Sequence, residues 1–306
     1  MVFANFASLV TIAAASLAAA APTQKRAAPG QSNIDTVILN YALTLEHLEA
    51  AFYRDSLNML SADDFKNAGF QPWIRQRFIE IGGQEQQHVA FLTKALGDKA
   101  VKECKYDFGV TDVNSFIATS QLLEGVGVSA YLGAAANITS TDYLTAAGSI
   151  LTTEARHSAL VQSSAALSDP AGAPYDVPLD FNQTYSLAAP LIKSCPDSNA
   201  KLPVSAFPAL TLSPNKSLKP GEKVKVSGKG VNDGQYLAAI TAGSTLFSQI
   251  QNGHAQVPEG VQTGRTYYLV TKGKSVSDDS TVAGPVASDY LLSAAEAASK
   301  VDNIKQ

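Results

Sequence analysis

The chain has 306 residues, of which 45% are hydrophobic and 16% are charged, and its formal net charge at pH 7 is −4. This length is sufficient for two domains. A mildly acidic chain with so few charged residues lacks the basic patch that nucleic-acid binding requires, so we expect no nucleic-acid partner.

The N-terminal segment is apolar, and no charged residue precedes Lys25. Four alanines followed by Pro22 form a small-residue context typical of cleavage, so residues 1–21 are predicted to be a secretory signal peptide. Lys25-Arg26 resembles a dibasic processing site, which makes residues 22–26 a predicted pro-segment and Ala27 the approximate start of the mature chain. The alternative is a membrane anchor, but no basic flank follows the apolar stretch. We therefore expect a protein secreted to the extracellular space or cell wall, with no membrane span in its mature form.

The periodicity of apolar residues predicts four helices between residues 33 and 168. Helix start and stop signals set their ends. The predicted helices cover residues 33–60, Pro72 to about Leu96 with Gly97 as the stop, a segment from after Thr111 to about Ala136, and a segment from near Ser140 to before Pro170.

The connection Asp98–Val110 between the second and third helices is unusually long for a bundle. Its thirteen residues can extend to about 43–47 Å, and a helix of roughly 25 residues is about 37 Å long. The segment can therefore return along the whole bundle as a single crossover, or form a loop beside an antiparallel neighbour. It contains Cys104, and Cys195 is the other cysteine of the chain, so one Cys104–Cys195 disulfide is expected in an oxidising compartment.

The second half of the chain differs in composition and in the pattern of its apolar residues. Residues 169–205 are rich in Pro, Ala, Ser and Asp and are predicted to be an irregular segment that wraps the bundle. Residues 206–290 contain short alternating segments separated by turn residues, which predicts five or six strands in a small immunoglobulin-like β-sandwich. The predicted strands lie at about 209–212, 223–227, 236–241, 245–250 and 266–271. A short helix is predicted over Ala287–Lys300, with residues 291–306 forming the C-terminal helix and tail. The predicted fold class is thus mostly α, a four-helix bundle followed by a β-sandwich.

Three Asn-x-Ser/Thr sequons occur, at Asn137, Asn182 and Asn215. They are candidate glycosylation sites if the chain is secreted.

Two words of the form Glu-x-x-His repeat, Glu85–His88 and Glu154–His157. Each places a carboxylate and an imidazole one turn apart on the same face of a predicted helix. Upstream of each word lies a glutamate with a tyrosine seven residues later.

Those upstream pairs are Glu46 with Tyr53, and Glu124 with Tyr131. The resulting order, Glu, Glu-x-x-His, Glu, Glu-x-x-His, matches the ligand set of a carboxylate-bridged two-metal site in a four-helix bundle. In that arrangement Glu46 and Glu124 come from the first helix of each pair. Glu85 and Glu154 bridge or chelate, and each histidine binds one ion.

The alternative interpretation is that a Glu-x-x-His word simply lies on a solvent-exposed helix face. Two observations favour metal binding instead. The chain has four histidines, and two of them are in these words. Glu124 lies in the apolar run 122–128, where a lone buried carboxylate is costly without a cation or hydrogen bonds.

Residues 43–53, Leu-Thr-Leu-Glu-His-Leu-Glu-Ala-Ala-Phe-Tyr, resemble a segment of the secreted fungal ferritin-like proteins of the stress-response type and of the plant desiccation-related proteins. Residues 33–168 as a whole resemble the ferritin-like superfamily. The resemblance implies a ferritin-like bundle and bound metal ions.

In that superfamily the first ligand glutamate has Ala three residues later and Tyr seven residues later. Glu46 is followed by Tyr53 at the second distance but by Glu49 at the first. Glu49 is therefore a candidate as an extra ligand or as a replacement for Glu46, and the sequence leaves both open. Tyr53 and Tyr131 are candidates for hydrogen bonding to the metal carboxylates and for a catalytic role, or else they fill the core.

The leading functional hypothesis is a secreted oxidoreductase with two iron or manganese ions that reacts with dioxygen or peroxide. Glu and His ligands suit both metals. Apolar residues surround the ligands, with small ones at Gly125 and Gly127, which favours a small oxidant over the polar substrate of a two-metal hydrolase. The alternatives are metal sequestration without turnover, and a metal-free stress or cell-surface protein whose β region contacts the cell wall or a protein partner.

Overall fold

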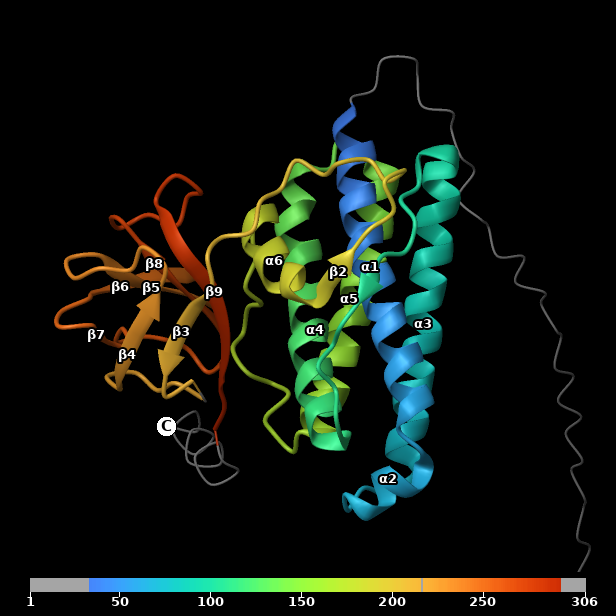
Figure 1. Cartoon of the computed structure of the whole chain (residues 1–306), viewed down its shortest axis with the longest axis horizontal. Helices are drawn as coiled ribbons and strands as arrows, with labels where there is room; N and C mark the ends of the chain where they lie inside the picture. The colour runs from blue at the N-terminus through green and yellow to red at the C-terminus, as the bar shows by residue number, and fades with distance from the viewer. Residues whose placement is uncertain (1–32, 216, 293–306) are drawn as a thin grey trace, which may run out of the picture. The chain divides into compact units, whose positions relative to one another are not determined.

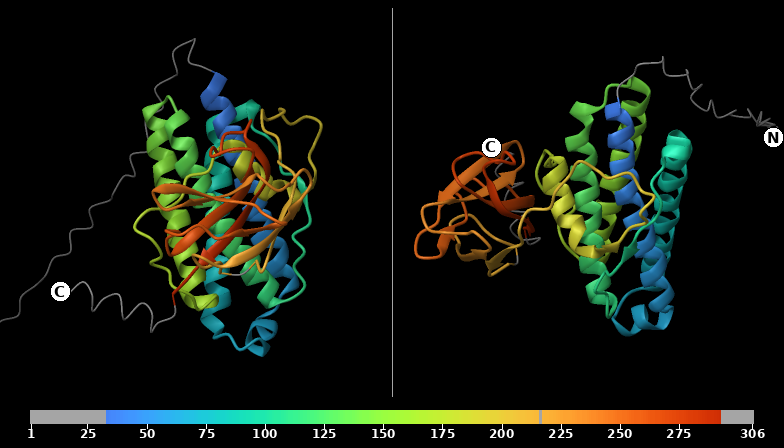
Figure 2. Two further views of the ribbon diagram at one scale, coloured as in Figure 1. Left: turned by 90° about the vertical axis from the view of Figure 1, so that its left-hand side faces the viewer. Right: turned by 45° about the horizontal axis from the view of Figure 1, so that its top comes forward.

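The computed structural model of the chain describes residues 33–215 and 217–292. Four long helices lie side by side in this part of the chain (Figures 1 and 2). They are α1 (Asn33–Met59), α3 (Pro72–Leu96), α4 (Val113–Ala134) and α5 (Thr141–Leu160). Helix α1 packs chiefly against α3, and α4 against α5. The four predicted helices are confirmed, with ends that differ by a few residues and with Gly97 ending α3 at a positive φ of 56°.

Short helical turns follow several of the helices. They are the 3₁₀ turns Gly97–Lys99, Ala135–Asn137 and Ala189–Leu191, and the π-helical turn Val161–Ala165, which continues α5.

One helix in the bundle was missed. Helix α2 (Ala62–Asn67) lies in the stretch that the sequence left as a connection. Its start is held by a capping box, in which the Ser61 hydroxyl accepts from the Asp64 N–H and the Asp64 carboxylate accepts from the Ser61 N–H. Phe65 anchors α2 because its side chain is buried in the bundle core.

The connection between α3 and α4 runs back along the length of the bundle (Figure 1). Helices α3 and α4 therefore point in the same direction, so the crossover is the correct alternative. Strand β1 (Lys105–Tyr106) in this connection pairs with β2 (Ile192–Ser194). The predicted Cys104–Cys195 disulfide is present beside them, with the two Cα atoms 4.2 Å apart.

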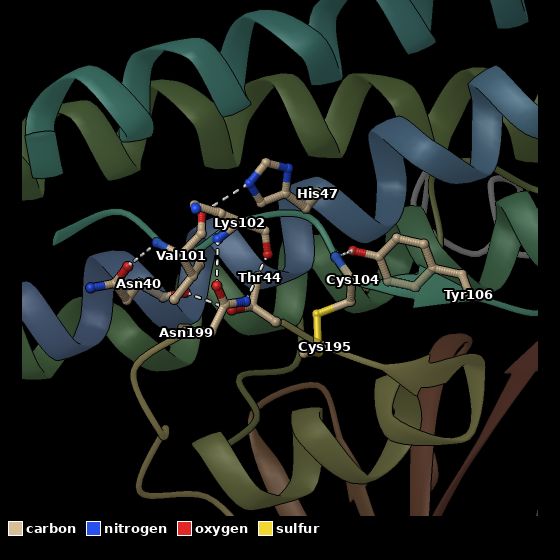
Figure 3. Close-up of a disulfide and its surroundings, with 9 residues drawn as sticks. All are labelled: Asn40, Thr44, His47, Val101, Lys102, Cys104, Tyr106, Cys195 and Asn199. Carbon is tan, nitrogen blue, oxygen red and sulfur yellow. Dashed lines mark hydrogen bonds between the residues drawn. A yellow bond between two sulfur atoms is a disulfide. The ribbon is translucent and has the colours of Figure 1, made fainter. Parts of the chain in front are cut away.

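Hydrogen bonds from the residues just before Cys104 extend this contact (Figure 3). The Asn199 side chain accepts from the Lys102 N–H at 2.8 Å and donates to the Lys102 carbonyl at 2.7 Å. The Asn40 side chain of α1 accepts from the Val101 N–H. The crossover is thus fastened to α1 and to the segment that follows the bundle.

Residues 169–205 are less irregular than predicted. They contain helix α6 (Phe181–Ala188), which starts at a capping box between Asp180 and Gln183, so the prediction was wrong for this stretch. The segment before α6 crosses α4 closely. The Leu179 N–H donates to the Ser129 carbonyl, and a Cβ at Gly133 would lie 1.8 Å from the Leu179 carbonyl oxygen.

The predicted β region is confirmed as two antiparallel sheets. Their orders are β3-β4-β7 and β6-β5-β8-β9. The strands are β3 (Leu210–Ser213), β4 (Lys223–Gly228), β5 (Tyr236–Thr241), β6 (Ser244–Gln249), β7 (His254–Gln256), β8 (Gly264–Thr271) and β9 (Thr281–Tyr290). Buried side chains from both sheets, among them Leu212, Val224, Leu237 and Val270, form one core.

The helix predicted from Ala287 was wrong for its first residues. Ala287 lies in β9 and pairs with Tyr267 of β8. The pair Gly284-Pro285 is a turn signal in the sequence, but β9 is an edge strand, where proline is tolerated. The rest of that predicted helix, from residue 293, lies outside the described residues, as do the predicted signal peptide and pro-segment.

Buried contacts join β8 to α4. The Tyr267 hydroxyl donates to the Gly125 carbonyl at 3.0 Å, and the Arg265 guanidinium donates to the Gln121 carbonyl at 2.9 Å. Arg265 is in turn paired with Asp289 of β9. Within the described part of the chain, no helix is long and apolar enough to cross a membrane.

Candidate metal centre

The four long helices direct six acidic and imidazole side chains into one point of the bundle core. Helix α1 contributes Glu46, α3 contributes Glu85 and His88, α4 contributes Glu124, and α5 contributes Glu154 and His157. The four carboxylates are completely buried. Two groups form, in each of which one donor atom per residue lies within 4.8 Å of the others: Glu46, Glu85, His88 and Glu154, and Glu85, Glu124, Glu154 and His157. Glu85 and Glu154 belong to both groups.

Two glycines let the helices come close enough for this convergence. A Cβ at Gly82 of α3 would lie 2.7 Å from the Cβ of Tyr53 on α1. A Cβ at Gly127 of α4 would lie 3.0 Å from a carboxylate oxygen of Glu154. Helix α3 is unbroken at Gly82-Gly83, so Gly82 serves close helix packing.

Each imidazole lies close to more carboxylate oxygens than it can donate hydrogen bonds to. His88 Nδ1 lies 3.2 Å from Glu46 Oε2, 3.1 Å from Glu85 Oε2 and 3.2 Å from Glu154 Oε1. A ring nitrogen carries at most one proton. The same crowding surrounds His157 Nδ1, which lies 2.9 Å from Glu85 Oε1 and 3.2 Å from Glu124 Oε2.

Five of these atoms make no hydrogen bond with any described residue. They are Glu85 Oε1, Glu124 Oε2, both carboxylate oxygens of Glu154, and His157 Nδ1. The distances to neighbours are short, but the angles do not suit hydrogen bonds. A buried polar atom without a partner costs about 1–3 kcal/mol, and more if charged. Hard oxygen donors with a few imidazole nitrogens are a donor set for iron and manganese, so the cluster fits a possible two-metal site.

The second nitrogen of His157 supports this reading. His157 Nε2 lies 2.7 Å from the side-chain oxygen of Gln84, and an amide oxygen only accepts hydrogen bonds. Nε2 therefore carries the proton in the neutral ring, and Nδ1 presents its lone pair to the carboxylates, as a metal-binding histidine does. Sequence reasoning missed Gln84, an exposed residue on the flank of the ligand face with nothing in its neighbours to single it out.

Two tyrosines hold the terminal glutamates in a crossed arrangement. Tyr131 of α4 donates its hydroxyl proton to Glu46 of α1, and Tyr53 of α1 donates to Glu124 of α4. Tyr53 also lies 2.7 Å from the Ser120 hydroxyl. Burial raises the pKa of both phenols well above the usual value, so both remain protonated donors.

Glu49 lies beside the cluster and in neither donor group. It is buried, and a Cβ at Gly127 would lie 3.1 Å from its Oε1 atom and 3.0 Å from Glu154. Burial and the nearby charge of Glu154 raise its pKa well above the usual range. The structure therefore places Glu46, and not Glu49, among the converging donor atoms from α1, with Glu49 as an adjacent acid.

In the metal-free cluster, bound protons offset the repulsion between the buried carboxylates. Burial raises the pKa of Glu46 to about 7. Burial also pushes up the pKa of Glu85, but the neighbouring imidazoles of His157 and His88 outweigh it and lower the pKa to about 2. Burial opposes charging of the histidines, yet the carboxylates raise the pKa of His88 to about 12 and that of His157 to about 10. A metal cation would take the place of these protons.

The other candidate residues are spread over the surface. Asn137 and Asn215 are exposed. Asn182 is half-buried, and its side chain donates to Asp278 at 2.7 Å and accepts from the Ser205 N–H at 2.7 Å. Glycosylation stays a prediction at all three. His47 points away from the cluster, toward the Val101 carbonyl (Figure 3).

A family model described as a ferritin-like domain matches residues 34–166. Residues 34–166 form a ferritin-like domain. The match covers α1 to α5 and all six converging side chains. The chain is also 30% identical over 246 residues to protein rds1 of Schizosaccharomyces pombe (strain 972 / ATCC 24843). That alignment covers 80% of this chain and 56% of rds1, so the chain spans a little over half the length of this relative.

Proposed function

We propose that this protein is a secreted oxidoreductase whose ferritin-like domain holds two iron or manganese ions and reacts with dioxygen or peroxide. The observation that carries the proposal is the set of buried, unpaired oxygens of Glu85, Glu124 and Glu154 facing two imidazole nitrogens. When bound, the two ions supply the electrons for reduction of the oxidant.

The chain's own residues have distinct tasks in this proposal. Glu85 and Glu154, which belong to both donor groups, would be ligands shared by the two ions. Glu46 with His88 would complete the ligands of one ion, and Glu124 with His157 those of the other. Tyr131 and Tyr53 orient the terminal carboxylates by hydrogen bonds.

The charges of the cluster also suit two divalent cations. Four ionised carboxylates and two neutral imidazoles carry four negative charges, which two divalent ions neutralise. Glu49 belongs to neither donor group, and burial raises its pKa, which favours its neutral form. Neutralisation matters because an unpaired charge in a buried site is strongly unfavourable.

Metal analysis of the purified protein tests the proposal. We expect two iron or manganese ions per chain, and loss of both in Glu85→Ala and Glu154→Ala variants. Glu80→Ala is the matched control, because Glu80 lies on α3 with 54% of its side chain exposed. Turnover is then measured by adding dioxygen or hydrogen peroxide to Fe(II)- or Mn(II)-loaded protein. A loaded protein that is inert to both oxidants indicates sequestration and contradicts the oxidoreductase assignment.

One observation favours the metal-free alternative. The imidazole–carboxylate pairs neutralise part of the cluster without a cation, so a scaffold protein can be built on the same residues. A well-folded protein that takes up neither metal would establish this alternative, with the β region as the contact surface for a cell wall or a protein partner.

Secretion is the remaining part of the proposal. The disulfide is typical of an oxidising compartment. N-terminal sequencing of protein recovered from the medium should find a start near Ala27, and an intact Met1 would contradict the assignment.

A further inference from the structure

An apolar pocket lies in the bundle core next to the carboxylate cluster. Side chains from all four long helices line it, including Leu39, Ala42, Leu92, Ala134, Ala147 and Ile150. It offers about 30 Å³ of room for the centre of a water-sized molecule.

The helix spacing places this pocket directly against the proposed metal ligands. Ala42 precedes Glu46 by four residues on α1, and Ile150 precedes Glu154 by four residues on α5. Residues four apart lie on one helix face, one turn from each other. Tyr131 lines the pocket and also donates its hydroxyl proton to Glu46, so the pocket and the carboxylate cluster share this side chain.

The pocket offers few hydrogen-bonding groups. Tyr131 uses its hydroxyl on Glu46, and Tyr41, which also lines the pocket, donates to the Phe181 carbonyl at 3.2 Å. The other inner lining side chains are hydrocarbon. A molecule with O–H groups would lose its hydrogen bonds to water on entering, whereas an apolar molecule loses none.

The size of the pocket restricts its occupant further. With about 30 Å³ of room for the centre of a water-sized molecule, the pocket suits an occupant of only a few heavy atoms. The outer rim includes Phe91, which is 39% exposed, and half-buried Tyr143 and Ala147, which places the entrance between α3 and α5.

We propose that this pocket takes dioxygen from solvent to the cluster, and that dioxygen, not peroxide, is the oxidant. This inference rests on the proposed function, because an oxidant requires the metal site. Dioxygen is small enough for the pocket and has no O–H or N–H donors. Hydrogen peroxide, in contrast, would bury two O–H donors without acceptors.

Xenon is the probe for the pocket itself, since it is apolar and needs no metal to bind. Crystals of the mature protein, metal-free and metal-loaded, are pressurised with xenon. We expect xenon density among Ala42, Ala134 and Ala147 in both forms. The Ala134→Leu and Ala147→Leu variants fill the pocket from two helices and should exclude it. Ala118→Leu, at an exposed position of α4, is the matched control and should bind xenon as the wild type does.

The same variants test the supply of dioxygen. With Fe(II)-loaded protein, the oxidation rate at limiting dioxygen should fall about tenfold in each filled variant and stay unchanged in Ala118→Leu. Oxidation driven by hydrogen peroxide should be equal in all four proteins. Thermal unfolding shows whether Ala134→Leu or Ala147→Leu fails to fold. If one of them does, the other variant tests whether the pocket supplies dioxygen.

The outcomes separate the two proposals. Unchanged dioxygen kinetics in a variant that excludes xenon would overturn the role of the pocket while the metal site stands. Absence of xenon from the wild-type pocket would overturn it as well. Xenon binding in a wild type that takes up no metal would overturn the proposed function, and the assignment of dioxygen with it.

Discussion

The bundle core differs on the two sides of the carboxylate cluster. On the side of α2, the ring of Phe116 lies with its centroid 4.7–6.0 Å from those of Phe52, Tyr53, Phe65 and Phe78, and all five rings are completely or almost completely buried. On the other side, alanines of α1, α4 and α5 leave the apolar pocket. The same four helices thus close one end of the core and leave the other accessible.

This difference suggests a division of tasks. The aromatic end fixes the helix spacing and excludes water, which a preorganised cluster requires. The alanine end keeps a path to the cluster for a small molecule. Substitutions at the two ends should therefore have different consequences.

The largest expected effect is on stability at the aromatic end. Phe116→Ala should lower the free energy of unfolding by about 3–5 kcal/mol, because it leaves a cavity in a close-packed cluster. Ile150→Val at the pocket end should cost about 0.5–1.5 kcal/mol. Urea unfolding of both metal-free variants measures the two values. Equal costs would contradict the distinction between the two ends.

The two adjacent glycines of α3 offer a matched pair with opposite signs. Gly82→Ala should destabilise by about 1–3 kcal/mol, because the new methyl group would lie 2.7 Å from the Cβ of Tyr53. Gly83→Ala should stabilise by about 0.5–1 kcal/mol, because nothing lies within 4 Å and alanine favours a helix. Thermal unfolding decides, and a neutral Gly82→Ala would mean that α1 and α3 are not so closely packed.

A smaller effect is the pH dependence of the cluster between the two ends. In metal-free protein the pKa values of His88 and His157 are raised from 6.5 to about 12 and about 10. Above pH 6.5 the folded state keeps protons on both histidines that the unfolded chain has released, so its stability should fall as pH rises toward 10. The raised pKa of Glu46 acts in the same direction between pH 4.5 and about 7.

Metal should remove this fall, because bound cations replace the protons and binding strengthens as pH rises. Denaturant midpoints across this pH range, with a chelator and with Fe(II) or Mn(II), make the comparison. The same fall in stability with and without metal would show that the cluster titrates but binds no ion.

The long helices and the convergence of the six side chains follow from local spacing, which a sequence shows directly. Glu85 and His88 lie on one helix face because they are three residues apart. The order of the Glu and Glu-x-x-His motifs predicts which helices supply the ligands. Helices α2 and α6 are too short for a periodic pattern. Their signals were the capping boxes at Ser61–Asp64 and Asp180–Gln183.

Other features depend on contacts between elements and were beyond the sequence. The contact of Gln84 with His157 joins two helices through an exposed residue. A pocket for a small oxidant was expected at Gly125 and Gly127, but Gly125 faces Arg265 and Gly127 faces carboxylates. The larger apolar space lies at the alanine end instead. Side chains from four helices together form it, so no single segment of the sequence could reveal its position.

Anomalous diffraction from crystals soaked in Fe(II) or Mn(II) tests the central claim most directly. The account predicts two anomalous peaks in the bundle core, one beside Glu46 and His88 and one beside Glu124 and His157, with Glu85 and Glu154 between them. No peak within this cluster, in a protein whose fold matches the described one, would contradict the metal centre and the function built on it.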